Sequence, residues 1–174
     1  MFYRLALALC LVFMLGCSSY KGPDDYIVPI EINKTTFTSM AYLNSEIVVY
    51  LNDELTPKQK EVVIDSLKYQ LKEFEADWGA PSKKVTVFMF NTKLIPCGNR
   101  KGDFVGCHYG PTGPIHLAQT KYYSGGPFYH ELVHRNISGN DHEHKDPRWR
   151  YIWQPARYRI VEELEARNKV LLNN

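Results

Sequence analysis

Three residues in the segment 130–134 have the types and spacing needed for chemistry on a metal ion. His130 and His134 are four residues apart, so on a helix both imidazoles lie on one face and can bind the same ion. Glu131 follows the first histidine, where its carboxylate can reach a water molecule on that metal without binding the metal itself. A bound metal acidifies water, and a nearby carboxylate can take its proton. The spacing therefore predicts metal-assisted hydrolysis.

A metal that activates water usually has three protein ligands and one open position, so a third ligand must come from another part of the chain. The segment 139–147 contains two further histidines, His142 and His144. We favour His144, because Asp146 and the proline after it predict a helix N-cap that would fix the backbone beside it. His142 is the alternative. The unused histidine can bind a carboxylate, hold a second metal with Asp141, or orient a ligand.

Other side chains are weaker candidates for roles at this site. The acidic candidates for the third ligand lie on the expected last helix and are Glu162, Glu163 and Glu165. Arginines surround them in the sequence, so a solvated charged face is the simpler interpretation. The candidates for polarising a substrate carbonyl are three tyrosines, Tyr122, Tyr123 and Tyr151. Packing is the simpler role for each of them.

The H-E-x-x-H motif at 130–134, and the order of elements expected over 56–166, resemble the zincin metallopeptidases. The resemblance implies a Zn²⁺ cofactor, a peptide or protein substrate and Glu131 as general base. It also implies an α+β fold, in which a small twisted mixed sheet packs on a long helix and on the motif helix, with a helix at the C-terminus. The short strand 114–118, just before that helix, would then be an edge strand that lines the cleft and pairs with extended substrate.

The chain departs from one subgroup of this family. The metzincin pattern H-E-x-x-H-x-x-G-x-x-H needs glycine and histidine where this chain has Ile137 and Asn140. No methionine follows Met89, so the Met-turn of that subgroup is absent from the sequence too. A carboxylate from the last helix as third ligand would instead be the gluzincin arrangement.

Local patterns predict the elements that position these residues. Thr56 and Gln59 form a capping box around a proline, and apolar residues at helical spacing continue to a stop at 79–81. Pro127 starts the motif helix, and Gly139 and Asn140 end it. The expected strands are 26–32, 37–43, 46–51, 84–90 and 114–118, of which 84–90 is central because it is almost entirely apolar. A helical turn starts at 146, Pro155 interrupts it, and 158–172 is the final helix.

The N-terminus has the pattern of an export signal. Arg4 precedes an apolar run over 5–15 that is too short to span a bilayer as a helix. The run ends in Met-Leu-Gly-Cys, which resembles the lipobox of bacterial lipoproteins and implies a lipid on Cys17. We therefore expect a signal peptide over 1–16, a tether over 17–25 and one domain over 26–174. Ser18, not aspartate, follows the cysteine, which in a Gram-negative cell would direct the protein to the outer membrane, facing the periplasm or the cell surface.

Cysteine content and charge narrow the class of protein further. Outside the cytoplasm Cys97 and Cys107 are expected to form a disulfide, since Cys10 leaves with the signal and Cys17 is lipidated. His108 leaves open the alternative that these cysteines bind metal. The chain has 21 basic and 19 acidic residues, and no basic stripe or motif that reads nucleic acid. Nucleic acid is therefore not an expected partner.

Together these patterns predict a lipid-anchored zinc hydrolase of the bacterial cell envelope, most simply a metallopeptidase. The alternative is a lipoprotein that binds zinc without catalysis, in which the metal is structural or sensed. An adhesion or assembly module without metal is disfavoured, because it does not explain why all six histidines fall between residues 108 and 144.

Overall fold

The computed structural model describes residues 37–81, 83–97, 103–118, 126–137 and 144–173. Its elements in chain order are β1 (Ser39–Tyr42), β2 (Ile47–Leu51), α2 (Pro57–Trp78), β3 (Val85–Phe90), β4 (Ile95–Pro96), β5 (Asp103–Phe104), β6 (Gly106–His108), β7 (Ile115–Ala118), α3 (Pro127–Asn136), the π-helical turn η4 (Trp149–Trp153) and α4 (Gln154–Asn173). The expected signal peptide, the tether with Cys17, and the strand expected at 26–32 lie outside the described residues. The fold is mixed α and β, as expected.

A five-stranded mixed sheet has the order β1-β2-β3-β7-β6. The three inner strands are parallel, and β1 and β6 run antiparallel to their neighbours at the two edges. The prediction that 84–90 is central is confirmed, since β3 is the middle strand. The prediction that 114–118 is an edge strand is wrong, because β7 pairs with β3 on one side and with β6 on the other. The edge strand beside the motif helix is β6, a segment for which the sequence predicted no strand.

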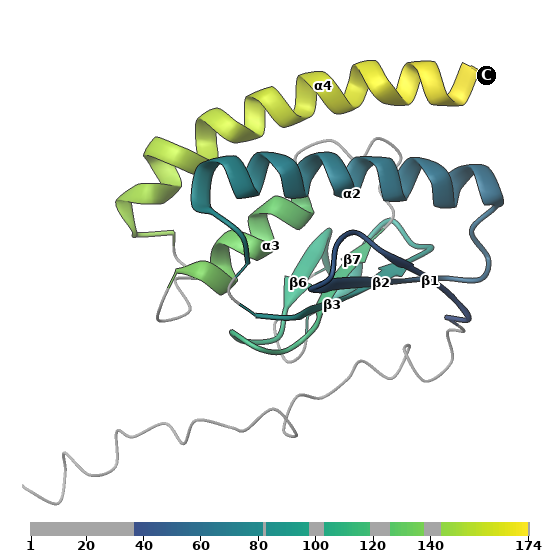
Figure 1. Cartoon of the computed structure of the whole chain (residues 1–174), viewed down its shortest axis with the longest axis horizontal. Helices are drawn as coiled ribbons and strands as arrows, with labels where there is room; N and C mark the ends of the chain where they lie inside the picture. The colour runs from purple at the N-terminus through teal and green to yellow at the C-terminus, as the bar shows by residue number, and fades with distance from the viewer. Residues whose placement is uncertain (1–36, 82, 98–102, 119–125, 138–143, 174) are drawn as a thin grey trace, which may run out of the picture.

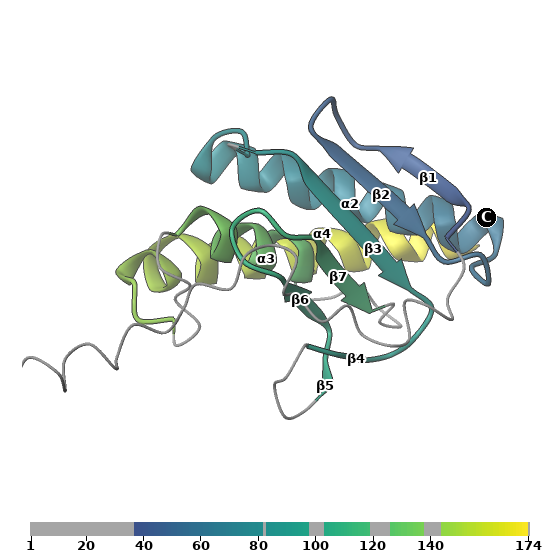
Figure 2. The ribbon, with the colours of Figure 1, turned by 90° about the horizontal axis from the view of Figure 1, so that it is seen from below.

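The helices lie on one face of the sheet. Figure 1 shows α2 across the sheet with α4 on its outer side, and Figure 2 shows the sheet in front of all three helices. The main core fills the space between these layers and includes Val49, Val63, Leu67, Ile115 and Leu132, each at most 2 % exposed. On the opposite face a smaller cluster gathers Phe90, Ile95, Tyr109 and the two cysteines, under a two-stranded β4-β5 ribbon. None of the helices in the described ranges is long and apolar enough to cross a membrane.

Helix α2 forms as its sequence predicts. The Thr56 hydroxyl accepts from the Gln59 N–H at 3.2 Å, and the Gln59 side chain accepts from the Thr56 N–H at 2.8 Å. The capping box is therefore confirmed, and Pro57 is the first helical residue. The helix ends at Trp78, because Gly79 takes a left-handed φ of 79° that other residues rarely adopt.

The prediction that Pro155 interrupts the C-terminal helical segment is wrong. Helical structure begins at Pro147 and continues through η4 into α4. In the π-helical turn the Gln154 N–H bonds to the Trp149 carbonyl, five residues back. Pro155, which has no N–H, follows directly in the first turn of α4, so the wider turn absorbs the residue that would interrupt a regular α-helix.

Candidate metal centre

The motif helix α3 is held at its N-terminus by a glutamine on another helix. The Gln70 side-chain oxygen accepts from the N–H groups of Phe128 and Tyr129 at 2.9 and 3.2 Å. These are two of the first N–H groups of the helix, which have no partner within it. Gly126 precedes them with a φ of 63°, and a Cβ there would lie 3.2 Å from Ile160. The entry to α3 is therefore fixed by side chains of α2 and α4, while Pro127 is the first helical residue, as predicted.

Tyr129 fixes the same helix from its side. Its hydroxyl donates to Asp77 at 2.8 Å and accepts from the Trp78 indole N–H at 2.9 Å. Arg159 of α4 in turn bonds Asp77 at 3.1 Å. Burial and the hydrogen bond to Asp77 raise the pKa of Tyr129, so it stays a neutral donor. Three helices thus share one polar network behind the motif.

The helix ends at Asn136, earlier than the predicted stop at Gly139 and Asn140. Ile137 turns extended and its N–H caps the Val133 carbonyl. The chain therefore leaves the helix within one turn of His134, and the histidine proposed as third ligand follows eight residues after the helix end.

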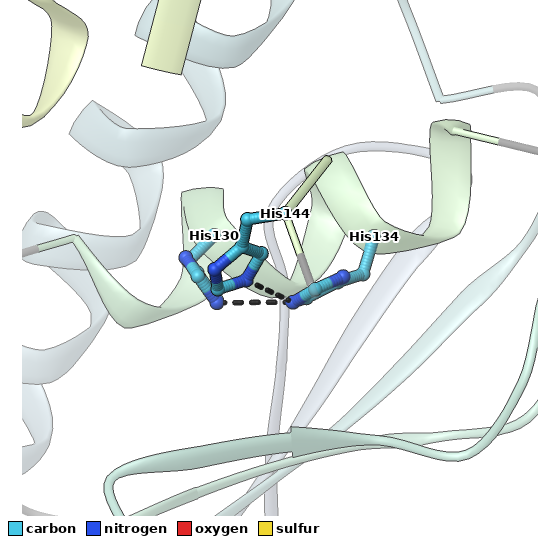
Figure 3. A group of neighbouring side chains, drawn as sticks. All are labelled: His130, His134 and His144. Carbon is cyan, nitrogen blue, oxygen red and sulfur yellow. Dashed lines mark hydrogen bonds between the residues drawn. The ribbon is translucent and has the colours of Figure 1, made fainter. Parts of the chain in front are cut away.

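His130, His134 and His144 converge (Figure 3). The Nε2 atom of His134 lies 3.0 Å from that of His130 and 3.2 Å from that of His144. One ring nitrogen from each histidine lies within 4.8 Å of the other two, the spacing that a shared metal ion requires. Zn–N bonds of about 2.0–2.1 Å at tetrahedral angles place ligand nitrogens roughly 3.3 Å apart, so this donor set fits a zinc ion. Among the described residues this is the one group of three or more candidate ligands.

The backbone and the neighbours of His144 orient its ring toward the other two histidines. His144 has a φ of 54°, in the left-handed region that costs a non-glycine residue about 1 kcal/mol or more. Its ring packs 4.2 Å from the Trp149 ring, and Trp149 also contacts both other imidazoles at 4.6 and 5.0 Å. The Asp146 carboxylate accepts from the Arg148 N–H at 2.9 Å, which confirms the predicted N-terminal cap beside this histidine.

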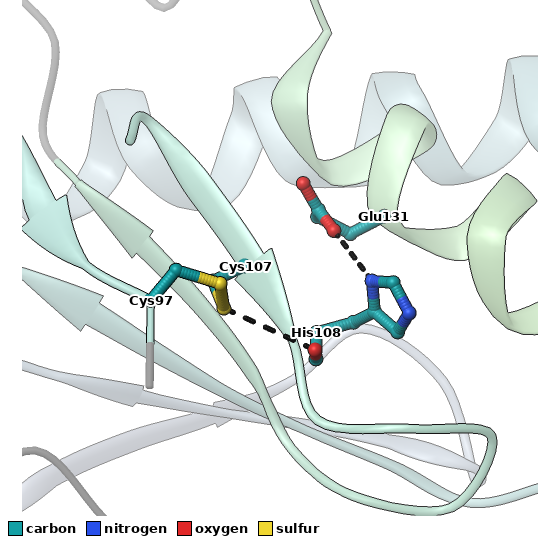
Figure 4. The surroundings of a disulfide bond; sticks show 4 residues. All are labelled: Cys97, Cys107, His108 and Glu131. Carbon is teal, nitrogen blue, oxygen red and sulfur yellow. Dashed lines mark hydrogen bonds and ion pairs between the residues drawn. A yellow bond between two sulfur atoms is a disulfide. The ribbon is translucent and has the colours of Figure 1, made fainter. Parts of the chain in front are cut away.

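Glu131 points into the same region and is held by the edge strand (Figure 4). Its Oε2 atom lies 2.9 Å from His108 Nδ1, and both side chains are buried. A Cβ on Gly106 would lie 2.9 Å from the Oε1 atom, so glycine at this position leaves the space that the carboxylate occupies. His108 also stacks on His134, with ring centres 4.9 Å apart. Edge strand and motif helix therefore meet at the carboxylate.

A cavity of about 450 Å³ opens over these groups. Its wall combines the histidines and Glu131 with all of β6, the disulfide, Trp153 and Arg157. Cys97 and Cys107 form the predicted disulfide, which joins the residue that follows β4 to β6 (Figure 4). The alternative in which these cysteines bind metal is therefore wrong.

Burial shapes the charge of one of the three imidazoles, that of His130. Desolvation, with a smaller effect of His144, His108 and Arg157, lowers the pKa of His130 to about 4 against the opposing pull of Glu131. At neutral pH this imidazole is therefore uncharged, which is the form that binds a metal ion.

The other candidate site residues fall into two groups: those that the structure places away from the histidine cluster, and those that lie outside the described residues. Glu162, Glu163 and Glu165 lie outside the histidine cluster, and Glu163 pairs instead with Arg167 at 2.7 Å. Tyr151 is 71 % exposed and is not part of the cavity wall. His142, Asp141, Tyr122 and Tyr123 lie outside the described residues.

Sequence reasoning missed several residues that build the site. They are Gln70, Gly106, His108 as the partner of Glu131, the indoles Trp149 and Trp153, and Arg157. Only Gln70 gives a local signal, because it is a polar residue within the buried stripe of α2 between Leu67 and Phe74. The others come together through pairing of β6 with β7 and through the turn η4, which spacing alone does not reveal.

Comparison with known proteins gives no match: no family model, curated protein or solved structure resembles this chain significantly.

Proposed function

We propose that this protein is a zinc-dependent hydrolase with a zincin-like fold, most simply a metallopeptidase. One observation carries the proposal. Three imidazoles from two separate segments bring their nitrogens within 4.8 Å of one another on the wall of a cavity, and the buried Glu131 reaches the same cavity. Three protein ligands leave one position for water, as in catalytic rather than structural zinc sites.

His130, His134 and His144 are the proposed ligands, and neutral imidazole nitrogen is a donor well suited to Zn²⁺. When bound, the metal would supply a Lewis acid that acidifies a water molecule and polarises the substrate carbonyl. The indoles of Trp149 and Trp153 pack against the imidazole rings and limit their rotation.

Glu131 is the proposed general base and then the proton donor to the leaving amine. His108 holds its Oε2 atom, which leaves Oε1 to exchange the proton. The carboxylate is also confined by Gly106, so its direction is set before substrate binds. His108 is in this scheme a positioning residue that acts through Glu131.

The edge strand β6 is the proposed support for extended substrate. In the described sheet β6 pairs only with β7, and it contributes all of its residues to the cavity wall. An unpaired strand edge offers backbone N–H and C=O groups to a peptide. This role passes to β6 from the inner strand β7, for which the family resemblance implied it.

The test compares zinc content and peptide hydrolysis in wild type, Glu131→Gln, His130→Ala and the control Glu165→Gln. Glu131→Gln should keep zinc and lose roughly 10²–10⁴-fold in turnover, since only the proton carrier is removed. His130→Ala should lose zinc. Glu165, an exposed carboxylate on α4 outside the cluster, should be replaceable without effect on either. Wild-type activity in Glu131→Gln would contradict the mechanism, and a wild-type protein that binds zinc but hydrolyses nothing would favour a structural or sensing metal.

We further propose that the protein is anchored to the cell envelope by a lipid on Cys17. The support is the signal-like segment 1–16 and the lipobox-like residues before that cysteine. Cys17→Ser should abolish incorporation of labelled fatty acid and move the protein from the membrane to the soluble fraction.

A further inference from the structure

The cavity wall contains one permanent cation that the proposed mechanism does not use. Apart from the histidines, Arg157 and Glu131 are the two titratable residues of the wall. Glu131 is engaged by His108, and its carboxylate is reserved for proton transfer in the proposed function. The positive charge of Arg157 is therefore not balanced by a second carboxylate in the described wall.

Arg157 differs from three of the four other arginines of its helical segment, each of which pairs with a carboxylate, and unlike the fourth, Arg150, it lines the cavity. Arg159 pairs with Glu73 and Asp77, Arg167 with Asp65 and Glu163, and Arg148 with Asp146. Arg157 has no carboxylate partner among the residues that the structure describes. The Arg157 guanidinium packs over Trp153, whose ring centre lies 5.6 Å from the guanidinium carbon.

The backbone that carries Arg157 is rigid. Its neighbours Ala156 and Ile160 are fully buried against the core, so the start of this side chain is fixed. Trp153, one turn earlier on the helix, contacts His130 and lines the same cavity. The indole thus contacts both the guanidinium and a proposed metal ligand.

A guanidinium presents a planar fork of N–H donors that matches a carboxylate, and such paired hydrogen bonds are strong. A cation kept without an anionic partner at the wall of a substrate cavity is suited to an anion brought by the substrate. We propose that Arg157 binds a substrate carboxylate, so that the protein prefers peptides with a free carboxylate close to the bond that is cleaved. This inference rests on the proposed hydrolase function, because it names the substrate class of that site.

The test uses one N-dansylated pentapeptide of alanine and phenylalanine in three forms. They are the C-terminal acid, the C-terminal amide, and the amide with glutamate as its last residue. Binding is measured by fluorescence anisotropy on zinc-loaded Glu131→Gln, which should hold the peptide without turning it over. Hydrolysis is measured on zinc-loaded protein with an intact Glu131.

The acid should bind about 10–100-fold more tightly than the amide, as expected for a charge-assisted bidentate contact. Adding Arg157→Gln should abolish that preference and leave zinc content unchanged. Arg157→Lys should restore only part of it, since lysine keeps the charge but not the fork. The matched control is Arg150→Gln, because Arg150 also stacks on an aromatic ring but lies outside the cavity wall. It should keep the full preference.

The three peptides separate the two sources of the carboxylate. Preference for the acid alone identifies the C-terminus as the ligand, and equal preference for the glutamate amide identifies an acidic side chain. Equal binding of acid and amide, including no measurable binding of either, contradicts the role of Arg157. Failure of wild type to hydrolyse any form, with the binding preference intact, contradicts the peptidase proposal and not the carboxylate site.

Discussion

On the side of α3 that faces α2 and α4, the polar groups are hydrogen-bonded to one another. Around the side that faces the cavity, one residue has a strained backbone and one cation has no carboxylate partner among the described residues. Toward α2, Gln70 caps the helix and Tyr129 closes a network with Asp77. Toward the cavity, His144 has a left-handed φ of 54°, and Arg157 has no carboxylate partner among the described residues. The same short helix therefore lies between two different kinds of environment.

We infer from this difference that residues on the packed side hold the site in place, and that residues on the cavity side would bind the metal and the substrate. Strain and uncompensated charge lower stability, and they persist only where the surrounding structure imposes them. The packed side supplies that rigidity, since a ligand carried on a fixed helix keeps its position without the metal. We therefore expect substitutions on the packed side to act on folding and those on the cavity side to act on metal binding and turnover.

The largest effect on stability is expected for Gln70→Met, which keeps the side-chain size and removes the acceptor. Two buried backbone N–H groups of α3 would lose their partner, and the free energy of unfolding should fall by about 2–4 kcal/mol. Chemical denaturation of the metal-free protein measures this. Gln154→Met, at an exposed glutamine of α4, should change stability by less than about 0.5 kcal/mol. Equal losses of stability in the two variants would contradict the proposed role of the packed side in holding α3.

On the cavity side, His144→Asn should separate metal binding from folding. Asparagine tolerates a left-handed backbone, so the metal-free protein should change in stability by no more than about 1 kcal/mol. Zinc affinity should fall roughly 100-fold or more, since a lost ligand costs at least as much as a lost partner of a ligand. Competition with a chelating dye measures it. His142→Asn is the matched control, and a larger loss of affinity there would identify His142 as the third ligand.

Sequence patterns predicted those parts of the site that depend on near neighbours in the chain. The capping box at Thr56, the spacing of His130 and His134, and the pairing of Cys97 with Cys107 each depend on local order or on a short loop. The place of His144 was also predicted, from the helix start that follows it.

The parts that the sequence did not predict depend on distant contacts. Strand β6 is three residues long and became the edge only because it pairs with β7. Pro155 has the local signal of a helix break, yet the π-helical turn before it satisfies the Gln154 N–H without a break. The capping of α3 by Gln70 joins residues 58 positions apart. Tertiary packing decides each of these cases, and spacing carries no information about it.

The smallest of the three effects concerns a histidine that serves packing alone. Four of the described histidines line the cavity, whereas His116 lies on the far face of the sheet against Phe88, Phe90 and Tyr109. Its Nδ1 atom has no hydrogen-bond partner in the described part of the chain. Burial lowers the pKa of His116 from 6.5 to about 4, so the folded protein keeps this imidazole neutral where the unfolded chain would protonate it.

Stability should therefore fall as the pH drops below 6.5, because protons bind the unfolded state preferentially down to about pH 4. At pH 5 the loss from this one histidine is about 2 kcal/mol relative to pH 8. His116→Phe should remove that loss, so the difference in stability between variant and wild type should shift by about 2 kcal/mol in favour of the variant between the two pH values. Any overpacking by phenylalanine acts at both pH values and cancels, as does the protonation of His130 in the metal-free protein. The same pH dependence in both proteins would mean that His116 is protonated in the folded state, and that the far face of the sheet is not the apolar environment its contacts describe.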